Sequence, residues 1–598
     1  MSEFFDYKNA LEEHQSERSF ETYKKLSELR ESGSSYVTPS LRQINISILR
    51  NFTAEPLEQM LLVEAFILGI DLKIHFDGYD TVMETTYKPS PAVQSADAIV
   101  VLQVLETLSP ALGSRFAESS QDLIEAETIR IVQNLKTYVN NLKEKSNSLI
   151  VLNTFPIPSY PSLGFADNAL AFGQVETIMS LNAEVLRLFK NDSQVEVFDL
   201  FQSVGRIGSL RAFDPRMWRV AKNPFSFYGM SEISNDLIRL INVRFSARKK
   251  CLVLDCDNVL WNGILGEGGV KSLFLEVQRM AIDLYETGVL LAIASKNNQE
   301  DVLRYFEQEN EMLIKSHHLS AIEVNWNNKA ENIEKIALKL NIGLDSLVFV
   351  DDSEFECDLV RKILPDVTVI RFNGNEFSFR RNLLQRGLFD VLSLTKEDRL
   401  RNQMYKENVQ RKLVLEASTT FEEYLSSLEI VVEVGRVTDD EIVRVSQLTQ
   451  KTNQFNLTTR RYTESEIANL SKQKDTRVLF LKASDKIADL GLVGVAILRV
   501  NGKTAEIDTL LLSCRALGRG IESAFISAIK NFAASSGYEN LTGEYLETKK
   551  NKQVQDFYSE HGFESVKGSS SDAFICDLQE YNPTTPDSIR IVTLFSEA

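Results

Sequence analysis

The chain has 598 residues, which is room for about three or four domains at roughly 150 residues each. Its 84 acidic residues outnumber 66 basic ones and give a net charge of −18, so we do not expect general nucleic-acid binding, which requires clustered Lys and Arg. The five cysteines form no Cys-x-x-Cys pair, the five histidines lack zinc-ligand spacing, and no apolar run or leader indicates a membrane, so we expect a reduced, cytoplasmic protein.

The first part of the chain alternates between strand-like and helix-like segments, after a polar stretch over 1–43 that we expect to be helical. Short apolar runs predict strands at 44–49, 71–76, 98–102 and 148–152. The periodicity of 57–68 predicts an amphipathic helix. Strands that alternate with helices predict a doubly wound α/β domain over 44–245.

The order of this domain faintly resembles that of the SGNH hydrolases, with Asn153 placed after a strand. Those enzymes carry a serine nucleophile after the first strand and a late Asp-x-x-His pair. Here Arg50-Asn51-Phe52-Thr53 follows the strand, and 225–230 contains no histidine. The resemblance implies an SGNH- or flavodoxin-like fold, for which we expect a docking or structural role and no catalysis.

Two carboxylates, Asp255 and Asp257, directly follow the apolar run 251–254. Such a run predicts a buried parallel strand, and the ligand sites of open α/β sheets lie beyond the carboxyl ends of the strands. Alternation along an extended chain turns both acids to one side, which suits a nucleophile and a proton donor that share a Mg²⁺. Asp-x-Asp alone also occurs in turns, calcium loops and glycosyltransferase metal sites.

Polar residues end two further apolar runs downstream. Ser295-Lys296-Asn297 follows the run 288–294, and Asp351-Asp352 follows the run 347–350. Between them, Lys329 opens a helical stretch that extends to Leu340. This order resembles the haloacid dehalogenase (HAD) superfamily, which implies a Rossmannoid phosphotransfer domain over 246–394.

The resemblance to the HAD superfamily implies a role for each polar residue. Asp255 would be the nucleophile, Asp257 the acid and base, and Lys329 the cation that offsets charge on phosphate and nucleophile. Mg²⁺ would be held by Asp255, by the backbone carbonyl of Asp257, and by Asp352 or Asp351, of which we prefer Asp352. The phosphate-binding residues would be Ser295, Lys296 and Asn297.

The spacing of these residues limits what covers the site. The stretches from Asp257 to Ser295 and from Ser295 to Lys329 are short enough to be filled by helices and turns. No sizeable cap domain fits between them. We therefore expect an open site, which admits phosphate carried on a large partner or completed by another domain.

A mixed-charge stretch over 395–417 predicts a helical connector to a last domain, expected over 418–580 and followed by a tail at 581–598. Strand-like runs at 491–498 and 505–512 are joined through Asn501-Gly502, which predicts a hairpin.

Arg515-x-x-Gly518-x-Gly520 then leads into a long helix. A glycine-containing turn at a helix start offers backbone N–H groups and the helix dipole to a phosphate. Together with the later segment Phe557-Tyr558-x-x-x-Gly562-Phe563, the turn resembles the acyl-CoA motif of the GNAT N-acetyltransferases. The resemblance implies a GNAT-like α+β acyltransferase domain in which pantetheine or CoA is bound by Arg515, Gly518, Arg519 and Gly520.

The complete order of motifs resembles one family, the FkbH-like proteins of HAD subfamily IIIC, over roughly 44–580. The matching segments are 254–261, 295–298, Asn325-Trp326-x-x-Lys329, 350–352, 451–456 and 513–515. Val259 and Asn262 depart from the usual Thr and Gly, and neither change removes a carboxylate.

The resemblance to this family implies a glyceryl transferase/phosphatase. Such an enzyme takes 1,3-bisphosphoglycerate, removes phosphate with Mg²⁺, and loads the glyceryl group onto the phosphopantetheine thiol of an acyl carrier protein. The alternative is a phosphatase that acts on a small phosphoester and uses its other domains for docking. Both functions take a small phosphorylated substrate, and neither involves nucleic acid or a membrane.

Cys514 stands between the predicted strand and the glycine turn, beside Arg515. A helix N-terminus and nearby cations lower a thiol pKa, so one hypothesis is that Cys514 carries a transient glyceryl thioester. The alternative is a packed, unreactive cysteine. Cys256 is the second choice for the thioester, because its side chain should point away from the carboxylates.

Gly343-Leu344-Asp345-Ser346-Leu347 looks like the attachment site of a carrier protein. Leu347 begins the strand that leads to Asp351, which leaves no separate domain around Ser346. We therefore expect a loop here and a carrier that is a separate protein. His317-His318 lacks metal-spaced partners and is expected at the surface.

Overall fold

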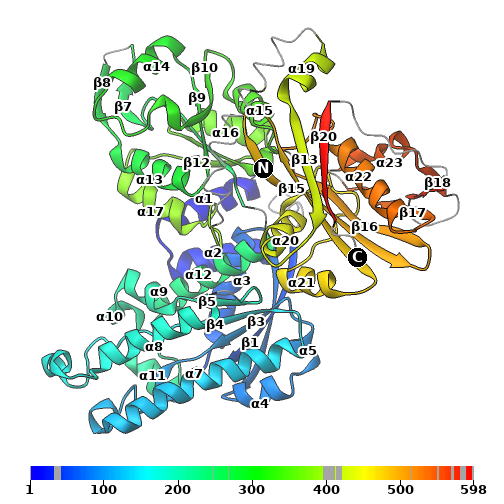
Figure 1. Ribbon diagram of the computed structural model, residues 1–598. Coiled ribbons are helices and arrows are strands. Elements are labelled where there is room, and N and C mark those ends of the chain that lie inside the picture. The colour runs from blue at the N-terminus through cyan, green and yellow to red at the C-terminus, as the bar shows by residue number, and fades with distance from the viewer. Residues whose placement is uncertain are drawn as a thin grey trace. The chain divides into compact units, whose positions relative to one another are not determined.

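The computed structural model describes residues 2–32, 42–190, 192–246, 248–266, 269–394, 411, 420–513, 515–548, 551–566, 572–579 and 588–595. The chain forms two compact units (Figure 1). Unit 1 comprises Met1–Ser246 and Asn382–Leu392, and unit 2 comprises Ala247–Arg381 and Ser393–Ala598. Of the predicted connector over 395–417, only Arg411 lies within the described residues.

Unit 1 is built on a five-stranded parallel sheet of order β2-β1-β3-β4-β5. Its strands are β1 (Arg42–Arg50), β2 (Ile70–Tyr79), β3 (Ala98–Leu102), β4 (Leu149–Asn153) and β5 (Val195–Phe198). This is the flavodoxin-like order of doubly wound sheets. The predicted parallel α/β architecture is therefore confirmed for this part of the chain.

Helices cover both faces of this sheet (Figure 1). They are α1 (Ser2–Ser16), α2 (Phe20–Glu31), α3 (Glu58–Ile67), α4 (Val82–Tyr87), α5 (Pro91–Gln94), α6 (Leu105–Leu108), α7 (Gln121–Lys143), α8 (Gln174–Phe189), α9 (Leu200–Ile207), α10 (Ser209–Ala212), α11 (Pro215–Ala221) and α12 (Phe227–Phe245). Alternation along the strands separates two cores, because Ile48 and Val100 pack on one face while Leu49 and Val101 pack on the other.

A buried polar network joins α1 and α2 to the rest of unit 1. Glu64 on α3 accepts a hydrogen bond from the Tyr23 hydroxyl at 2.5 Å and lies 3.2 Å from His14 Nε2. Arg18 lies 3.5 Å from Glu64 and donates to Glu232 at 2.7 Å. These paired charges fix the N-terminal helices against α3 and α12.

The first half of unit 2 is a second parallel sheet, of order β10-β9-β6-β11-β12. Its strands are β6 (Cys251–Leu254), β9 (Leu290–Ser295), β10 (Leu319–Val324), β11 (Leu347–Asp351) and β12 (Thr368–Arg371). The flanking helices are α13 (Leu275–Glu286), α14 (Gln299–Gln308), α15 (Lys329–Leu340), α16 (Glu354–Ile363) and α17 (Glu376–Gln385). Every residue of β6, β9 and β11 is buried, as their unbroken apolar runs predict.

One small hairpin, β7 (Trp261–Ile264) with β8 (Gly269–Leu273), is inserted between β6 and α13. Within the described ranges, the segments between β9 and β10 and between β10 and β11 hold only helices and turns. The chain thus has no cap domain at these positions, in agreement with the short spacings.

The second half of unit 2 is a mixed sheet of order β18-β19-β17-β16-β15-β14-β13-β20. Its strands are β13 (Ile430–Arg436), β14 (Thr476–Ser484), β15 (Asp489–Asn501), β16 (Thr504–Leu512), β17 (Asn540–Tyr545), β18 (Glu564–Val566), β19 (Asp572–Asp577) and β20 (Ile589–Leu594). Its helices are α19 (Phe421–Leu428), α20 (Ile442–Lys451), α21 (Glu464–Lys472), α22 (Ile521–Ser535) and α23 (Phe557–Glu560). The predicted hairpin is present between β15 and β16, with Gly502 at a φ of +57° in its turn.

The parallel strands β16 and β17 pair over Thr504–Ile507 only, and their carboxyl ends part. A short segment between α20 and α21 fills the space between them. Leu457 N–H donates to the carbonyl of Leu510 on β16 at 3.1 Å, and the Leu457 carbonyl accepts from Leu546 N–H, just beyond β17, at 2.9 Å. The chain itself therefore occupies the gap between the two strands.

Among the described residues, no helix has both the length and the apolar composition that a membrane span requires.

Candidate functional site

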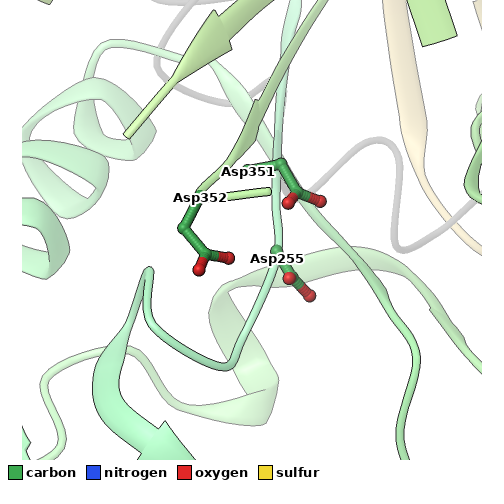
Figure 2. Close-up of side chains that lie close together, drawn as sticks. All are labelled: Asp255, Asp351 and Asp352. Carbon is green, nitrogen blue, oxygen red and sulfur yellow. The ribbon is translucent and has the colours of Figure 1, made fainter. Parts of the chain in front are cut away.

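Three carboxylates converge at the carboxyl ends of β6 and β11, which are neighbours in the sheet (Figure 2). Asp255 directly follows β6, Asp351 ends β11, and Asp352 is the next residue. Oxygen atoms of all three lie within 4.8 Å of one another. Because β6 is the first strand of this sheet and pairs with β9 on one side and β11 on the other, the acids sit where the strand order reverses.

Lys329 lies between two of these acids. It is the first residue of α15, whose N-cap is Asn328, and its ammonium is 2.7 Å from Asp255 Oδ2 and closer still to Asp351 Oδ2. Burial alone lowers the pKa of Lys329, but the charges of Asp255 and Asp351 outweigh it and hold that pKa above its usual range. The cation is therefore permanent at neutral pH.

The acids differ in how many of their oxygens are engaged. Asp351 is fully buried and binds Lys329 through Oδ2 and the backbone N–H of Ser353 through Oδ1, at 2.8 Å. Burial and the neighbouring charge of Asp255 raise the pKa of Asp351 to about 6. Asp255 Oδ1, by contrast, is buried and has no hydrogen-bond partner among the described residues.

This donor set fits Mg²⁺, a hard cation that takes carboxylate oxygens. Asp255 Oδ1 offers an unused buried oxygen, and Asp352 offers a half-buried carboxylate that does not bind Lys329. Asp351 is the least available of the three because Lys329 and Ser353 occupy both of its oxygens. The geometry thus favours Asp255 and Asp352 as metal ligands.

Asp257 is positioned by three donors. Its Oδ1 accepts from the indole N–H of Trp261 at 2.7 Å and from Leu265 N–H at 3.0 Å, and its Oδ2 accepts from the Asn297 amide at 3.0 Å. Burial raises the pKa of Asp257 and outweighs the opposing effect of these hydrogen bonds. A carboxyl group with a raised pKa suits an acid that gives up a proton near neutral pH. Its carboxylate is not one of the three grouped oxygen donors, and the predicted metal ligand is its backbone carbonyl.

The predicted phosphate-binding residues lie at the carboxyl end of β9, where Ser295 is the last strand residue and Lys296 and Asn297 follow it. Ser295 is buried, and its carbonyl accepts from Asn325 N–H at 3.1 Å, which holds the loop before Lys329. Asn297 donates to Asp257, as described above. Lys296 Nζ lies 2.6 Å from the buried Glu356 of α16, so its charge is already partly offset.

Two positioning residues were missed in the sequence. Trp261 orients Asp257, and its place four residues after that acid was the available signal. Glu356 pairs with Lys296, and only its place in the first turn after the acid pair connected it to the site.

Cys256 is a poor candidate for an acyl thioester. It is fully buried, and burial together with the charges of Asp255 and Asp257 holds its pKa well above the usual range for a thiol. Cys514 lies outside the described residues, so its hypothesis stays a prediction.

The glycine turn before α22 has the expected backbone, with Gly518 at a φ of +73° and Gly520 at +74°. The N–H of Gly518 is not available to a ligand phosphate, however, because it donates to the carboxylate of Glu522 at 2.8 Å. Arg519 is buried 3.6 Å from Asp485, which also forms a two-point ion pair with Arg411. The structure therefore surrounds the turn with its own carboxylates.

Arg515, also predicted to bind pantetheine, donates to the Ser513 hydroxyl at 3.4 Å. The carrier-like stretch around Ser346 forms a short turn that continues directly into β11, and His317 is exposed on another such turn.

The strand ends of unit 1 hold no free polar group at two key positions. The Asn51 amide exchanges hydrogen bonds with the backbone of Val104, at 3.0 and 2.8 Å. The Asn153 amide does the same with Gln103, at 2.9 and 2.8 Å. Both side chains are buried and serve to link loops, which fits a structural role for these residues.

No protein-family model matches the sequence, and no curated protein matches it either. Among solved structures, the chain is similar to the N-terminal part of the protein BF1531 from Bacteroides fragilis, which contains a phosphatase domain and was crystallised in complex with Mg. The two share 24% identity with a TM-score of 0.54, over 62% of this chain and 99% of that one. At this identity the likeness shows the fold.

Two acetyltransferase structures are similar over a smaller part of the chain. One is a putative GNAT-family acetyltransferase from Desulfovibrio desulfuricans, at 14% identity over 25% of this chain and 99% of that one, with a TM-score of 0.21. The other is the ribosomal-protein-S18-alanine N-acetyltransferase from Escherichia coli, at 13% identity over 24% and 90%, with a TM-score of 0.19.

Proposed function

We propose that this chain is a Mg²⁺-dependent HAD-type enzyme that removes phosphate from a phosphoglycerate donor and passes the glyceryl group to the phosphopantetheine thiol of a separate acyl carrier protein. The observation that carries the proposal is the convergence of Asp255, Asp352 and Lys329, with Asp257 held beside them. The donor implied by the resemblance is 1,3-bisphosphoglycerate.

The geometry supports an aspartyl-phosphate route. Asp255 attacks phosphorus, so that an Asp255 O–P bond forms while the bond from phosphorus to the leaving oxygen breaks. Asp257 donates its proton to that oxygen and then takes a proton from the water that hydrolyses the phosphoenzyme. Lys329 offsets the charge that gathers on Asp255 and the phosphoryl oxygens. Asp255 and Asp352 would hold Mg²⁺, which would supply positive charge to the transferred phosphoryl group.

The two phosphates of 1,3-bisphosphoglycerate call for different chemistry. The phosphate on C1 is an acyl phosphate, so a thiolate that attacks C1 forms the thioester and expels phosphate without further activation. The phosphate on C3 is an ester, and its removal needs a nucleophile and a proton donor such as Asp255 and Asp257. One chain with both a HAD-type site and an acyl-handling domain can therefore use the whole donor.

The open HAD-type site agrees with a protein-borne substrate. Within the described ranges, the hairpin β7–β8 is the insertion between β6 and α13, and its residue Ile264 is exposed. A phosphoglyceryl group at the end of a pantetheine arm is long and thin, and it can enter a site that has no cap domain.

The GNAT-like turn favours the second candidate function, a phosphatase with docking modules. Glu522 occupies the Gly518 N–H, and Asp485 lies beside Arg519, so an incoming phosphate meets two carboxylates. Under this alternative the last domain binds partners and transfers no acyl group, and Cys514 has no covalent role.

Incubation with 1,3-bisphosphoglycerate, Mg²⁺ and holo carrier proteins separates the two functions. We expect phosphate release and a glyceryl mass on the carrier, with Asp255→Asn abolishing phosphate release from C3. Cys514→Ala should abolish glyceryl transfer and keep phosphatase activity if the thioester forms. Phosphate release without a glyceryl mass on any carrier or on the enzyme would favour the simple phosphatase.

A further inference from the structure

Unit 1 carries a short helix, α11, whose side chains are all at least partly exposed. In α11, seven residues with the sequence Pro-Arg-Met-Trp-Arg-Val-Ala, no side chain is buried. Val220 is 83% exposed and Met217 38% exposed, and Leu210 on the preceding helix α10 is 70% exposed. Large apolar side chains that stay exposed within one short stretch of chain make this segment a candidate binding surface.

The same segment is strongly basic. From Arg206 to Lys222 the chain carries five cations and a single carboxylate, Asp214, although its net charge is −18. Arg206 is paired with Glu232 and Asp236. Arg216 lies 3.1 Å from Asp214 but its side chain is 89% exposed, and Arg211 and Arg219 are exposed as well. We call Leu210, Arg211, Arg216, Met217, Arg219 and Val220 the α10–α11 face.

Local contacts hold this face in one shape. The guanidinium of Arg211 lies 3.9 Å above the ring of Tyr228, and its carbonyl accepts from the Ser226 hydroxyl at 2.6 Å. Asp214 accepts from Arg216 N–H at 3.0 Å and so caps α11. Trp218 packs against the core of the unit. A surface that is already ordered loses little entropy when a partner binds.

The arrangement of the side chains favours a protein partner over a membrane. Arg216 and Arg219 form one stripe on α11, and Met217 and Val220 form the adjacent stripe, because residues three apart share a helix face. Arg and Met interleaved with aromatic residues are typical of protein interfaces. A helix that lies in a membrane surface needs a much larger apolar face than seven residues provide, and the acidic chain as a whole is repelled by anionic lipid.

Charge complementarity selects an acidic partner. An ordinary solvated surface of this acidic chain would repel an acidic protein, whereas the α10–α11 face attracts one locally. We propose that the α10–α11 face docks the acidic face of the acyl carrier protein that serves as acceptor. The identity of the partner rests on the proposed function, and the binding surface rests on the side chains described above.

Binding without chemistry tests this proposal. Fluorescence anisotropy measures the affinity of full-length enzyme for a labelled apo carrier protein, at low and at high salt. Arg216→Glu/Arg219→Glu should weaken binding by about tenfold or more and flatten its salt dependence. Val220→Ser tests the apolar stripe and should weaken binding severalfold.

A matched control reverses two exposed cations elsewhere in unit 1, Lys136→Glu/Arg187→Glu. It changes the net charge by the same amount and should leave the affinity within about twofold. Equal weakening in the control and the α10–α11 variant would show a net-charge effect and overturn the proposal. So would carrier binding that neither variant changes, or no carrier binding by the wild type.

The same variants also test two other binding partners for the α10–α11 face. Binding to anionic phospholipid vesicles that Arg216→Glu/Arg219→Glu abolishes, with carrier binding unchanged, assigns the face to a membrane. Cross-links from the face to another part of this chain, lost in the variant, assign it to an intramolecular contact. Either result overturns carrier docking.

The proposed reaction is tested separately with free pantetheine as acceptor. Glyceryl transfer to pantetheine that is equal in wild type and Arg216→Glu/Arg219→Glu keeps the reaction independent of docking. Failure of transfer with intact, charge-dependent carrier binding removes the reaction and leaves the docking surface standing.

Discussion

Replacing Lys329 with Met is the most direct test of how the candidate site is built. Lys329 and Asp351 have side chains that are 4% and 0% exposed, and the Asp255 side chain is 9% exposed. Lys329→Met keeps most of the side-chain volume and removes the cation that contacts both acids. Two buried carboxylates are then left close together without compensation.

The expected loss is large and has an upper limit. Removing one partner of a buried ion pair costs about 3–5 kcal/mol of unfolding free energy. The site can limit this loss by taking up a proton, because two adjacent carboxylates share one readily. Protonating an aspartate of ordinary pKa near 3.9 at pH 7 costs about 4 kcal/mol, at roughly 1.4 kcal/mol per pH unit. We therefore expect a loss of about 3–4 kcal/mol at pH 7.

The loss should depend on pH and on Mg²⁺. In the variant, the folded state holds a proton that the unfolded state lacks, so the pKa of one aspartate is raised on folding. A raised pKa means that stability falls as pH increases, and acidification from pH 7 to 6 should recover about 1 kcal/mol. Mg²⁺ also supplies positive charge, so it should stabilise Lys329→Met more than the wild type.

A single tryptophan can report on this domain alone. The chain has three tryptophans, and replacing Trp218 and Trp326 with Phe leaves Trp261, which is fully buried beside Asp257. Urea unfolding followed by Trp261 fluorescence, with EDTA or with Mg²⁺, gives the free energies. Lys335→Met, an exposed lysine on the same helix, is the control. A loss below about 1 kcal/mol, or one that grows on acidification, would refute the reasoning.

Three further predictions concern other parts of the chain. The Tyr558 hydroxyl is fully buried without a hydrogen-bond partner among the described residues, so Tyr558→Phe should stabilise its domain by about 1 kcal/mol, measured by amide hydrogen exchange in α22. Burial raises the pKa of Glu64, but the larger opposing effect of His14 and Arg18 leaves that pKa below its usual value. Unit 1 should therefore lose stability as pH falls below about 4. Glu64→Gln should remove this pH dependence and lower the free energy of unfolding by about 3 kcal/mol, measured by amide hydrogen exchange in α2. Glu522→Gln should tighten CoA or pantetheine phosphate binding severalfold in calorimetry, since it removes a carboxylate from the Gly518 N–H.

The positions of the acids were predictable because the strands that precede them are wholly apolar. In β6 and β11 every residue is buried, so the first polar side chain marks the strand end, and parallel strands bring those ends to one edge. Lys329 was found by its place at the start of a periodic helix. The Asn501-Gly502 pair predicted the hairpin correctly, although Asn501 ends β15 and the turn itself is Gly502-Lys503.

Side chains stop alternating regularly between the two sides of the chain where β6 ends. β6 ends at Leu254, and the chain then turns through Asn258 at a φ of +55°. The orientation of Asp257 depends on Trp261, Leu265 and Asn297, and the last of these lies 40 residues away. Hydrogen bonds over such distances leave no periodic signal in the sequence.

At the glycine turn, the sequence motif predicted the backbone conformation but not the charged groups around it. Its local conformation follows from Gly518 and Gly520, which adopt the left-handed backbone that the motif predicts. The charge around the turn does not follow from the motif, because the loop after β14 brings Asp485 to within 3.6 Å of Arg519. A motif read along the chain therefore gave the backbone and missed the carboxylates around it.

The two candidate sites differ in what an incoming phosphate must displace. At the carboxylate site Lys329 is paired with Asp255 and Asp351, and Asp255 keeps an unused oxygen, so a bound Mg²⁺ would supply the further positive charge that phosphate needs. At the glycine turn before α22, a phosphate must first displace Glu522 from the Gly518 N–H. We therefore expect the glycine turn to bind phosphate weakly. A pantetheine arm that is attached to a carrier protein would then depend on contacts between the carrier protein and another surface of the enzyme. We infer that the cations and apolar side chains of the α10–α11 face supply these contacts, which is why charge reversal on unit 1 should affect transfer to a carrier protein and spare transfer to free pantetheine.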